Sequence, residues 1–384
     1  MNINKEKKFL KPILFDKEDP SFLEHLSEHG YAVIQNVLTE EEIKKGFELF
    51  YKDWKHVSPN FDFENISTWT TDNSPMMWGK GMIYASGLGQ SDFQWYLRTR
   101  NNIKNIWKKI HKTDDIVVSY DGFSVFLDKR QKPKQWLHVD QGNSEQMLSI
   151  QGSYNFLKVS ELDAGFIVVP DSHKTFKNEN KKKGNFISLK NDDPHVEKAV
   201  KLIIPPNCFV LWNSKTVHAS TGMDSKIKTP ELNRLTNYIT FFPKKDRSEE
   251  MLEQRLNGYK LGHNCSHWAI YHHIKKHPFF LKKRYESRNF NNISPTLIDN
   301  KIPEKRLELI KNIKKTSKKY LFLLFYIIKM AKSNKHKLLH TGLIVIGVLL
   351  FIIALWAIVV PHYTCKDGGD CQWSFIGTNY SCDT

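Results

Sequence analysis

The pattern of apolar and polar positions opens with two helices on either side of a strand. Residues 21–29 have helical spacing, and residues 31–37 have the composition of a strand. Thr39, with Glu42 three residues later, forms a capping box, which satisfies the first free amides of a helix. This motif predicts an amphipathic helix that runs through Trp54.

Apolar residues recur at helical intervals again over residues 92–111, which predicts a further helix. Between these helices, residues 58–90 are rich in Gly, Asn, Ser, Thr and aromatic residues. We expect this stretch to be a long loop packed on the domain.

From Ile116 the pattern changes to short runs of β-branched and aromatic residues, which is typical of strands. The predicted strands cover residues 116–128, 147–159, 166–170, 200–204, 208–213 and 235–243. Many short strands at this spacing favour a mainly β fold with flanking helices, of the double-sheet jelly-roll type.

Past Pro243 the sequence becomes helical and charged, with predicted helices over residues 247–259 and 302–320. Between them lies a group of residue types that bind metals: His263, Cys265, His267, His272, His273 and His277. Their spacings fit no standard four-ligand pattern, and only one of them is a cysteine. We therefore interpret them as histidines on helix surfaces.

A stretch near the C-terminus has the character of a membrane span. Residues 341–361 contain no charged side chain, and residues 342–360 are almost wholly apolar, close to the roughly twenty residues that cross a bilayer as a helix. Lys332, Lys335 and Lys337 precede this stretch and only Lys366 follows it. The bias predicts a single-pass protein whose main domain is cytosolic and whose C-terminal tail is lumenal or extracellular.

The predicted organisation has four parts. A globular domain covers residues 1–262, a basic helical region 263–337, the membrane helix 338–361, and a polar tail 362–384. Within the basic region, the apolar run 320–328 lies between lysines, which favours a helix on the surface of an anionic membrane.

The charge is concentrated beside the predicted span. The formal net charge is +16, yet residues 1–243 carry 33 basic against 30 acidic side chains, whereas residues 244–337 carry 23 against 8. Attraction to anionic lipids explains this excess more simply than nucleic-acid binding does. We therefore expect a membrane partner and no nucleic-acid partner.

The two ends of the chain indicate different compartments. The first eleven residues are polar and rich in lysine, so we expect no signal peptide. Cys365, Cys371 and Cys382 crowd into the tail, where they allow one disulfide and leave one thiol for a disulfide-linked partner. Asn379 opens a glycosylation sequon that is usable only outside the cytosol.

The most specific chemical signal is His138 with Asp140. Side chains two apart on a strand share a face, so these two can bind one ion together. His218, where an apolar strand ends in a polar turn, supplies a third ligand. Two imidazoles and one carboxylate form the facial triad of non-haem Fe(II) oxygenases, which leaves positions on the metal open.

Two further residues suit an anionic co-substrate. Arg234 opens an apolar alternation, and a guanidinium there would bind a carboxylate through two parallel hydrogen bonds. Ser220 shares a face with His218 if that strand continues, and its hydroxyl can bind the same carboxylate. The ordinary alternatives are a surface arginine and a serine in a turn.

These motifs together resemble the phytanoyl-CoA dioxygenase family of Fe(II)/2-oxoglutarate oxygenases. The resemblance rests on His138-x-Asp140, on Gly-Phe-Ile-Val-Val-Pro-Asp-Ser-His-Lys over residues 165–174, on His218-x-Ser220 and on Arg234, and it runs from about Phe22 to Pro243. Two departures stand out. Asp171 replaces the family's usual glycine, which should alter only a turn, and residues 222–230 form an inserted loop between His218 and Arg234.

The resemblance implies a cupin-like double-stranded β-helix in which the triad binds Fe(II). It also implies that Arg234 and Ser220 hold 2-oxoglutarate, that Tyr154 lies beside this co-substrate, and that ascorbate serves as a reductant. Oxidative decarboxylation of 2-oxoglutarate would yield succinate and carbon dioxide while molecular oxygen hydroxylates a C–H bond. Loops such as residues 58–90 would form the substrate wall.

We therefore expect a membrane-anchored Fe(II)/2-oxoglutarate-dependent dioxygenase that acts on a lipid, an acyl group or a small metabolite. The alternative is a non-catalytic membrane scaffold that retains an oxygenase fold.

Overall fold

A computed structural model of the chain describes residues 8–77, 81–83, 86–127, 136–142, 149–178, 185–270, 302–311, 362–365, 371–375 and 378–380. The chain divides into two compact units, residues 1–313 and residues 314–384. The following paragraphs describe the first unit, which holds the candidate site.

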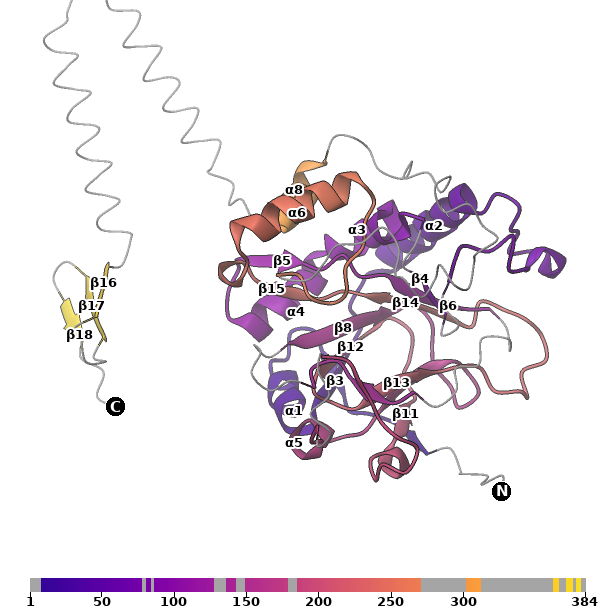
Figure 1. Cartoon of the computed structure of the whole chain (residues 1–384), viewed down its shortest axis with the longest axis horizontal. Coiled ribbons are helices and arrows are strands. Elements are labelled where there is room, and N and C mark those ends of the chain that lie inside the picture. The colour runs from indigo at the N-terminus through magenta and orange to yellow at the C-terminus, as the bar shows by residue number, and fades with distance from the viewer. Residues whose placement is uncertain are drawn as a thin grey trace, which may run out of the picture. The chain divides into compact units, whose positions relative to one another are not determined.

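Two β-sheets form the centre of the first unit (Figure 1). One sheet has six strands in the order β1 (Phe9–Leu10), β11 (Val200–Leu202), β9 (Gly165–Val168), β13 (His218–Thr221), β7 (His138–Val139) and β10 (Ile187–Ser188). The other has seven strands in the order β2 (Leu14–Asp16), β3 (Tyr31–Gln35), β12 (Cys208–Asn213), β8 (Ile150–Asn155), β14 (Arg234–Tyr238), β6 (Phe123–Phe126) and β4 (Met82–Ile83). A two-stranded sheet pairs β5 (Ile116–Val118) with β15 (Phe241–Pro243). This mainly β architecture agrees with the predicted jelly roll.

The inner faces of the two large sheets pack against each other. Tyr31, Val33 and Val210 from the seven-stranded sheet form one apolar cluster with Phe166 and Val168 from the six-stranded sheet. Alternate residues along each strand face this interior, because side chains on a strand alternate between its two faces. The same alternation decides which polar side chains point into the space between the sheets.

Helices cover the outer face of the seven-stranded sheet (Figure 1). The larger ones are α1 (Phe22–His29), α2 (Glu40–Val57), α3 (Asp92–Arg98), α4 (Asn101–His111), α6 (Glu249–Lys260) and α8 (Glu304–Lys311). Short helical turns are α5 (Ser172–Thr175), η1 (Ile66–Thr68), η2 (Leu88–Gln90), η3 (Val196–Lys198) and η4 (Lys244–Asp246). Trp54, Trp107 and Phe209 are among the buried residues that join this helical layer to the sheet. The flanking helices predicted from the sequence are therefore confirmed.

Local signals in the sequence set several of these boundaries. The Thr39 hydroxyl accepts a hydrogen bond from the Glu42 amide at 3.2 Å, and the Glu42 carboxylate accepts one from the Thr39 amide at 3.2 Å, so the capping box opens α2 as predicted. The helix predicted over residues 92–111 is interrupted where Arg100 adopts an extended backbone, giving α3 and α4. Likewise, the strand predicted over residues 116–128 is divided into β5 and β6.

The segment after α6 corrects one prediction. Residues 263–270 contain no helix, and His267 is buried, so the interpretation of this histidine as a helix-surface residue is wrong. The segment is held in the core by contacts that helical periodicity does not reveal. Two hydrogen bonds join Cys265 to Tyr120. The Cys265 amide donates to the Tyr120 carbonyl at 3.1 Å, and the Tyr120 amide donates to the Cys265 thiol sulfur at 3.0 Å. His272, His273 and His277 lie outside the described residues.

Helix α8 packs on the body of the first unit. Arg306 pairs with Asp92 at 2.5 Å and donates to the Tyr259 hydroxyl at 3.0 Å. Arg247 donates to the carbonyls of Ile310 and Lys311 at the end of this helix, where carbonyl groups lack partners within the helix. Residues 302–311 are thereby joined to α3 and α6, far from them in the sequence.

The second unit contains a three-stranded antiparallel sheet of β16 (His362–Cys365), β17 (Cys371–Phe375) and β18 (Thr378–Tyr380). Its register pairs Cys365 with Cys371. The predicted membrane helix over residues 338–361 and the predicted surface helix over 320–328 lie outside the described residues. Among the helices that are described, none combines the length and the apolar character that a bilayer crossing requires.

Candidate metal centre

Three side chains predicted as metal ligands converge between the sheets. Each of His138, Asp140 and His218 offers one ligand atom, and these atoms lie within 4.8 Å of one another. The His138 Nε2 atom is 3.7 Å from Asp140 Oδ1, and the His218 Nε2 atom is 3.3 Å from Asp140 Oδ2. Both imidazoles are buried, and the Asp140 side chain is 18% exposed. The arrangement is a compact set of two nitrogen donors and one carboxylate.

Strand pairing brings the two histidines together from positions far apart in the sequence. β13 meets β7 at a register that places His218 directly opposite His138. The loop before β13 is fixed by the run over residues 165–174, because the Ser172 hydroxyl accepts a hydrogen bond from the Val217 amide at 2.8 Å. In the same run Asp171 has a left-handed backbone (φ 63°). Glycine adopts this conformation most readily, and aspartate tolerates it. Asp171 therefore takes the place of the family's glycine without loss of the turn.

Each imidazole is oriented by a main-chain oxygen. His138 Nδ1 is 2.9 Å from the Trp136 carbonyl, and His218 Nδ1 is 2.9 Å from the Thr216 carbonyl. Because a carbonyl oxygen only accepts hydrogen bonds, Nδ1 carries the proton in both rings. A ring that is neutral in this tautomer has its lone pair on Nε2, the atom that faces Asp140. This is the tautomer that a metal-binding histidine needs.

The Asp140 carboxylate is held in its charged form. Burial acts to raise the pKa of Asp140, but without a metal the positive charge of protonated His138 and His218 and a hydrogen bond from His218 outweigh burial and hold the pKa well below the usual range of an aspartate. Gln151, on β8 of the opposite sheet, donates its side-chain amide to Asp140 Oδ2 at 2.8 Å. The Asp140 amide donates to the Ser214 carbonyl at 2.9 Å, which fixes the backbone beside the carboxylate.

Aromatic rings surround the histidines. The Trp136 ring stacks on His138 with centroids 4.5 Å apart, and Phe186 lies 4.7 Å from the same imidazole. Phe166 and Trp212 flank His218 at 5.8 Å and 5.3 Å. These rings cover the triad with apolar surface, which strengthens electrostatic interactions within the centre.

Arg234 enters the space between the sheets from β14. The side chain is buried, its Nε donates to the Thr236 hydroxyl at 3.0 Å, and its Nη1 donates to the Gly165 carbonyl on β9 at 3.3 Å. Gly165 pairs with Thr221, the residue after Ser220. No carboxylate among the described residues pairs with this guanidinium, and burial lowers the pKa of Arg234. A buried cation without an anionic partner is costly, so the site favours an anionic ligand.

Ser220 lies on the same face of β13 as His218. Its hydroxyl oxygen is buried and has no hydrogen-bond partner among the described residues. A buried hydroxyl without a partner loses the hydrogen bonds that water would supply. The structure thus brings Ser220 and Arg234 to the same side of the sheet interior, next to the triad.

Tyr154 is not brought to the triad. It belongs to the apolar cluster on the outer, helix-covered face of the seven-stranded sheet, and its hydroxyl donates to Asn207 at 2.9 Å. Gln151, three positions earlier on β8, faces the opposite side and reaches Asp140. The expected contact of Tyr154 with a co-substrate therefore disagrees with its placement. Counting residues back from Gly165 across a loop did not fix which side of the strand the residue faces.

Several residues of the centre were not predicted from the sequence. Gln151, Trp136 and Phe186 all contact the triad, and none belongs to a motif that identifies it. Trp136 precedes His138 by two positions, so period-two alternation was a usable signal for its contact with this histidine. Gln151 lies on β8 and Phe186 directly precedes β10, and only the packing of these distant segments reveals their contacts with the triad.

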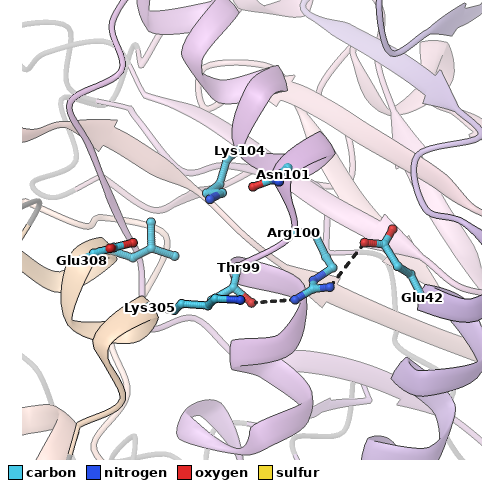
Figure 2. Close-up of a pocket in the computed structure, with 8 residues that line it drawn as sticks. Glu42, Thr99, Arg100, Asn101, Lys104, Lys305 and Glu308 are labelled. Atoms are coloured by element: carbon cyan, nitrogen blue, oxygen red, sulfur yellow. Dashed lines mark hydrogen bonds and ion pairs between the residues drawn. The ribbon is translucent and has the colours of Figure 1, made fainter. Parts of the chain in front are cut away.

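A pocket lies outside the metal centre, among helices α2, α3, α4 and α8 (Figure 2). It is a pocket of about 260 Å³. The residues that line it are Glu42, Thr99, Arg100, Asn101, Lys104, Lys305, Glu308 and Leu309. Arg100 pairs with Glu42 at 3.4 Å and donates to the Thr99 hydroxyl at 3.3 Å. Basic and acidic groups alternate around the opening, so the pocket carries little net charge.

Comparison with known proteins finds curated relatives of this chain. No family model matches the sequence. "Ava biosynthesis cluster protein O" of Aspergillus versicolor is 27% identical over 247 residues, covering 59% of this chain and 78% of the relative. "Putative phytanoyl-CoA dioxygenase" of Dictyostelium discoideum is 24% identical over 284 residues, covering 62% of this chain and 79% of the relative. The resemblance to phytanoyl-CoA dioxygenases that the motifs predict is confirmed by this second relative.

Solved structures of other proteins are also similar to this chain. The α-ketoglutarate-dependent carbocyclase SnoK of nogalamycin biosynthesis has a TM-score of 0.44 and 16% identity, covering 58% of this chain and 83% of its own. The GlcNAc-inducible protein GIG2 of Candida albicans has a TM-score of 0.46 and 12% identity, covering 83% of this chain and 88% of its own.

Proposed function

We propose that this chain is an Fe(II)- and 2-oxoglutarate-dependent oxygenase that hydroxylates a C–H bond of a small molecule or lipid. The observation that carries the proposal is that the Nε2 atoms of His138 and His218 each lie close to one oxygen of the Asp140 carboxylate. The resemblance to phytanoyl-CoA dioxygenases supports the same activity.

The residues present fit a ferrous ion. Two neutral imidazoles and an ionised carboxylate on one side of the metal match the donor set of the facial triad. Iron bound there with 2-oxoglutarate and oxygen would supply the oxidising power for hydroxylation, with succinate and carbon dioxide as co-products. The protein's contribution is to hold the three ligands: main-chain carbonyls fix both rings, and Gln151 fixes the carboxylate.

The residues on the open side fit a dicarboxylate. Arg234 is a buried cation with no carboxylate partner among the described residues, and Ser220 offers a buried hydroxyl without a hydrogen bond. One carboxylate of 2-oxoglutarate would satisfy both groups, with the guanidinium donating two hydrogen bonds and the hydroxyl one. The rings of Trp136 and Phe186 keep water away from the histidines.

Succinate release tests this proposal. Purified full-length chain, supplied with Fe(II), ascorbate and 2-oxoglutarate, should convert 2-oxoglutarate to succinate, faster when a substrate is present. Arg234→Met should bind iron normally and lose affinity for 2-oxoglutarate. A non-catalytic scaffold predicts instead that the wild-type protein binds neither iron nor 2-oxoglutarate.

We further propose that the chain is tethered to a membrane by residues 338–361. The support is the uncharged apolar stretch of the sequence with lysines on one side. In cells, full-length chain should remain in the membrane fraction after alkaline carbonate washing, and a chain without residues 338–384 should not. Release of both forms would contradict the tether.

A further inference from the structure

A buried carboxylate outside the triad has one oxygen without a hydrogen bond in the described part of the chain. Asp121, in the turn between β5 and β6, is 6% exposed. Its Oδ1 accepts a hydrogen bond from the Gly122 amide at 2.8 Å, and its carboxylate makes no ion pair with any described residue. Arg98 is a cation that contacts this turn, and it donates at 2.8 Å to the main-chain oxygen of Asp121. One carboxylate oxygen therefore has no hydrogen bond within the described part of the chain.

The strand register places this turn at the same end of the seven-stranded sheet as Gln151. The Tyr238 amide on β14 donates to the Gly122 carbonyl at 3.1 Å, and Tyr238 pairs with Ser153 on β8. Two positions from Ser153, on the same face of β8, Gln151 reaches Asp140 at 2.8 Å. Asp121 thus lies at the end of the seven-stranded sheet where Gln151 binds the triad.

The electrostatics agree with this placement. Burial raises the pKa of Asp121 to about 7, and the negative charge of Asp140 adds to the rise. Burial is the main cause that raises the pKa of Tyr238, and the negative charges of Asp121 and Asp140 add to the rise. Tyr238 itself is held at its hydroxyl by Ser124, 2.9 Å away. The three groups therefore share one region of the interior.

We propose that Asp121 binds a hydrogen-bond donor of the substrate, an ammonium or hydroxyl group, so that the substrate is a polar molecule bearing such a group. This inference rests on the proposed oxygenase function and specifies its substrate class. Asp121 is a specificity-determining residue in this account.

Three kinds of ligand can be compared by their effect on this carboxylate. A plain hydrocarbon would seal Asp121 from water and leave it unpaired, which is costly for a buried charge. A carboxylate-ended chain would be repelled by Asp121. An ammonium or hydroxyl group would donate to the free oxygen, and such charge-assisted hydrogen bonds are the stronger kind. The Asp121 carboxylate therefore favours donors over both alternatives.

Binding of matched probes tests the inference without turnover. Full-length chain is loaded with Zn(II) and 2-oxoglutarate, and dissociation constants are measured at pH 8 for n-alkyl amines, alcohols and carboxylates of equal chain length. We expect amines and alcohols to bind at least about tenfold more tightly than carboxylates, as one charge-assisted hydrogen bond allows. Amines binding more tightly than alcohols would identify the donor as an ammonium, and the reverse order as a hydroxyl.

Variants separate specificity from folding. Asp121→Asn should remove most of the tenfold preference, whereas Asp53→Asn should keep it. Asp53 is an equally buried carboxyl that accepts from the Phe93 amide at 2.8 Å in the helical layer, so it controls for loss of a buried acid. Melting temperatures are measured for both.

The outcomes are distinct for the two proposals. A wild-type preference for carboxylates, no measurable binding of any probe, or a donor preference that survives in a folded Asp121→Asn protein would overturn this inference. If wild-type protein binds 2-oxoglutarate in any of these cases, the oxygenase function stands. Failure of the wild-type protein to bind 2-oxoglutarate would instead contradict the oxygenase function.

Discussion

Gln151 donates its side-chain amide to Asp140 Oδ2 at 2.8 Å, and the same nitrogen lies 3.1 Å from the Ser214 hydroxyl. The contact joins the seven-stranded sheet to the six-stranded one at the metal centre. It fixes the rotation of the carboxylate, so that one oxygen faces each histidine. A ligand carboxylate that can rotate freely pays an ordering cost when it binds a metal.

Removal of this contact should weaken metal binding. For Gln151→Ala we predict a loss of about 10- to 100-fold in affinity for Fe(II), the usual effect of deleting a residue that orients a metal ligand. Competitive chelator titration under anaerobic conditions measures it. Gln141→Ala is a suitable comparison, because Gln141 is also buried and its side-chain oxygen accepts from the Ser149 amide. Equal affinities in Gln151→Ala and wild type would show that Asp140 needs no such support.

Arg234 is positioned by a chain of hydrogen bonds. Its Nε donates to Thr236 Oγ1 at 3.0 Å, and this hydroxyl donates to Asn155 Oδ1 at 2.9 Å. We predict that Thr236→Val raises the dissociation constant of 2-oxoglutarate about tenfold, as expected for losing one hydrogen bond to a charged group. Metal affinity should not change.

Thr236→Ser retains the hydroxyl and should restore 2-oxoglutarate binding to near the wild-type value. Calorimetry on the Zn(II)-loaded chain gives both constants. An equal loss in the valine and serine variants would indicate a packing role for Thr236 and no role in holding the guanidinium.

Asp121 makes folding stability depend on pH. Its pKa in the folded chain is about 7, because burial penalises the charged form, whereas an unfolded aspartate has a pKa near 3.9. Between these values the folded chain keeps a proton that the unfolded chain has lost, so stability falls as pH rises, by about 1.4 kcal/mol per pH unit.

We therefore predict that the stability of metal-free wild type relative to Asp121→Asn decreases from pH 4 to pH 7. Chemical denaturation at a series of pH values measures the difference between the two free energies of unfolding. A difference that stays constant or increases with pH would show that Asp121 is ionised in the folded chain throughout.

Helix α8 should contribute to the stability of the first unit. Arg306 joins this helix to Asp92 and Tyr259, and all three groups are at most partly exposed. We predict that Arg306→Ala lowers the free energy of unfolding by roughly 1 kcal/mol, the upper range for an ion pair that solvent partly reaches. Lys305→Ala, next to it, should have little effect. Equal losses of stability in Arg306→Ala and Lys305→Ala would contradict a specific role for the Arg306 ion pair.

The sequence was most informative where local chemistry decides the structure. The Thr39 and Glu42 capping box, the strand at residues 208–213 and the mainly β class with flanking helices all agree with the structure. In these cases the neighbours along the chain determine the conformation. His138 and Asp140 could be paired for the same reason, since they are two residues apart on one segment.

Features that depend on pairing between distant segments were harder to predict. Tyr154 was expected beside the co-substrate, but β8 pairs with β12 and β14 so that this ring faces the helices. Gln151 and Asp121 carry no sequence signal, because their importance arises only from the strands and turns that meet them. His267 was assigned to a helix surface, although residues 263–270 lie against the core through Cys265.

The most direct test of the account is the binding of iron to the triad. Anaerobic Fe(II) titration of the wild-type chain should give one ion per chain, and His218→Ala should bind none at the same concentrations. His195→Ala is the matched control, since His195 also faces an aspartate, Asp193, at 2.8 Å, but lies outside the triad. It should bind as wild type does. If His218→Ala bound as much iron as the wild-type chain, the metal centre would be contradicted, and with it the oxygenase function.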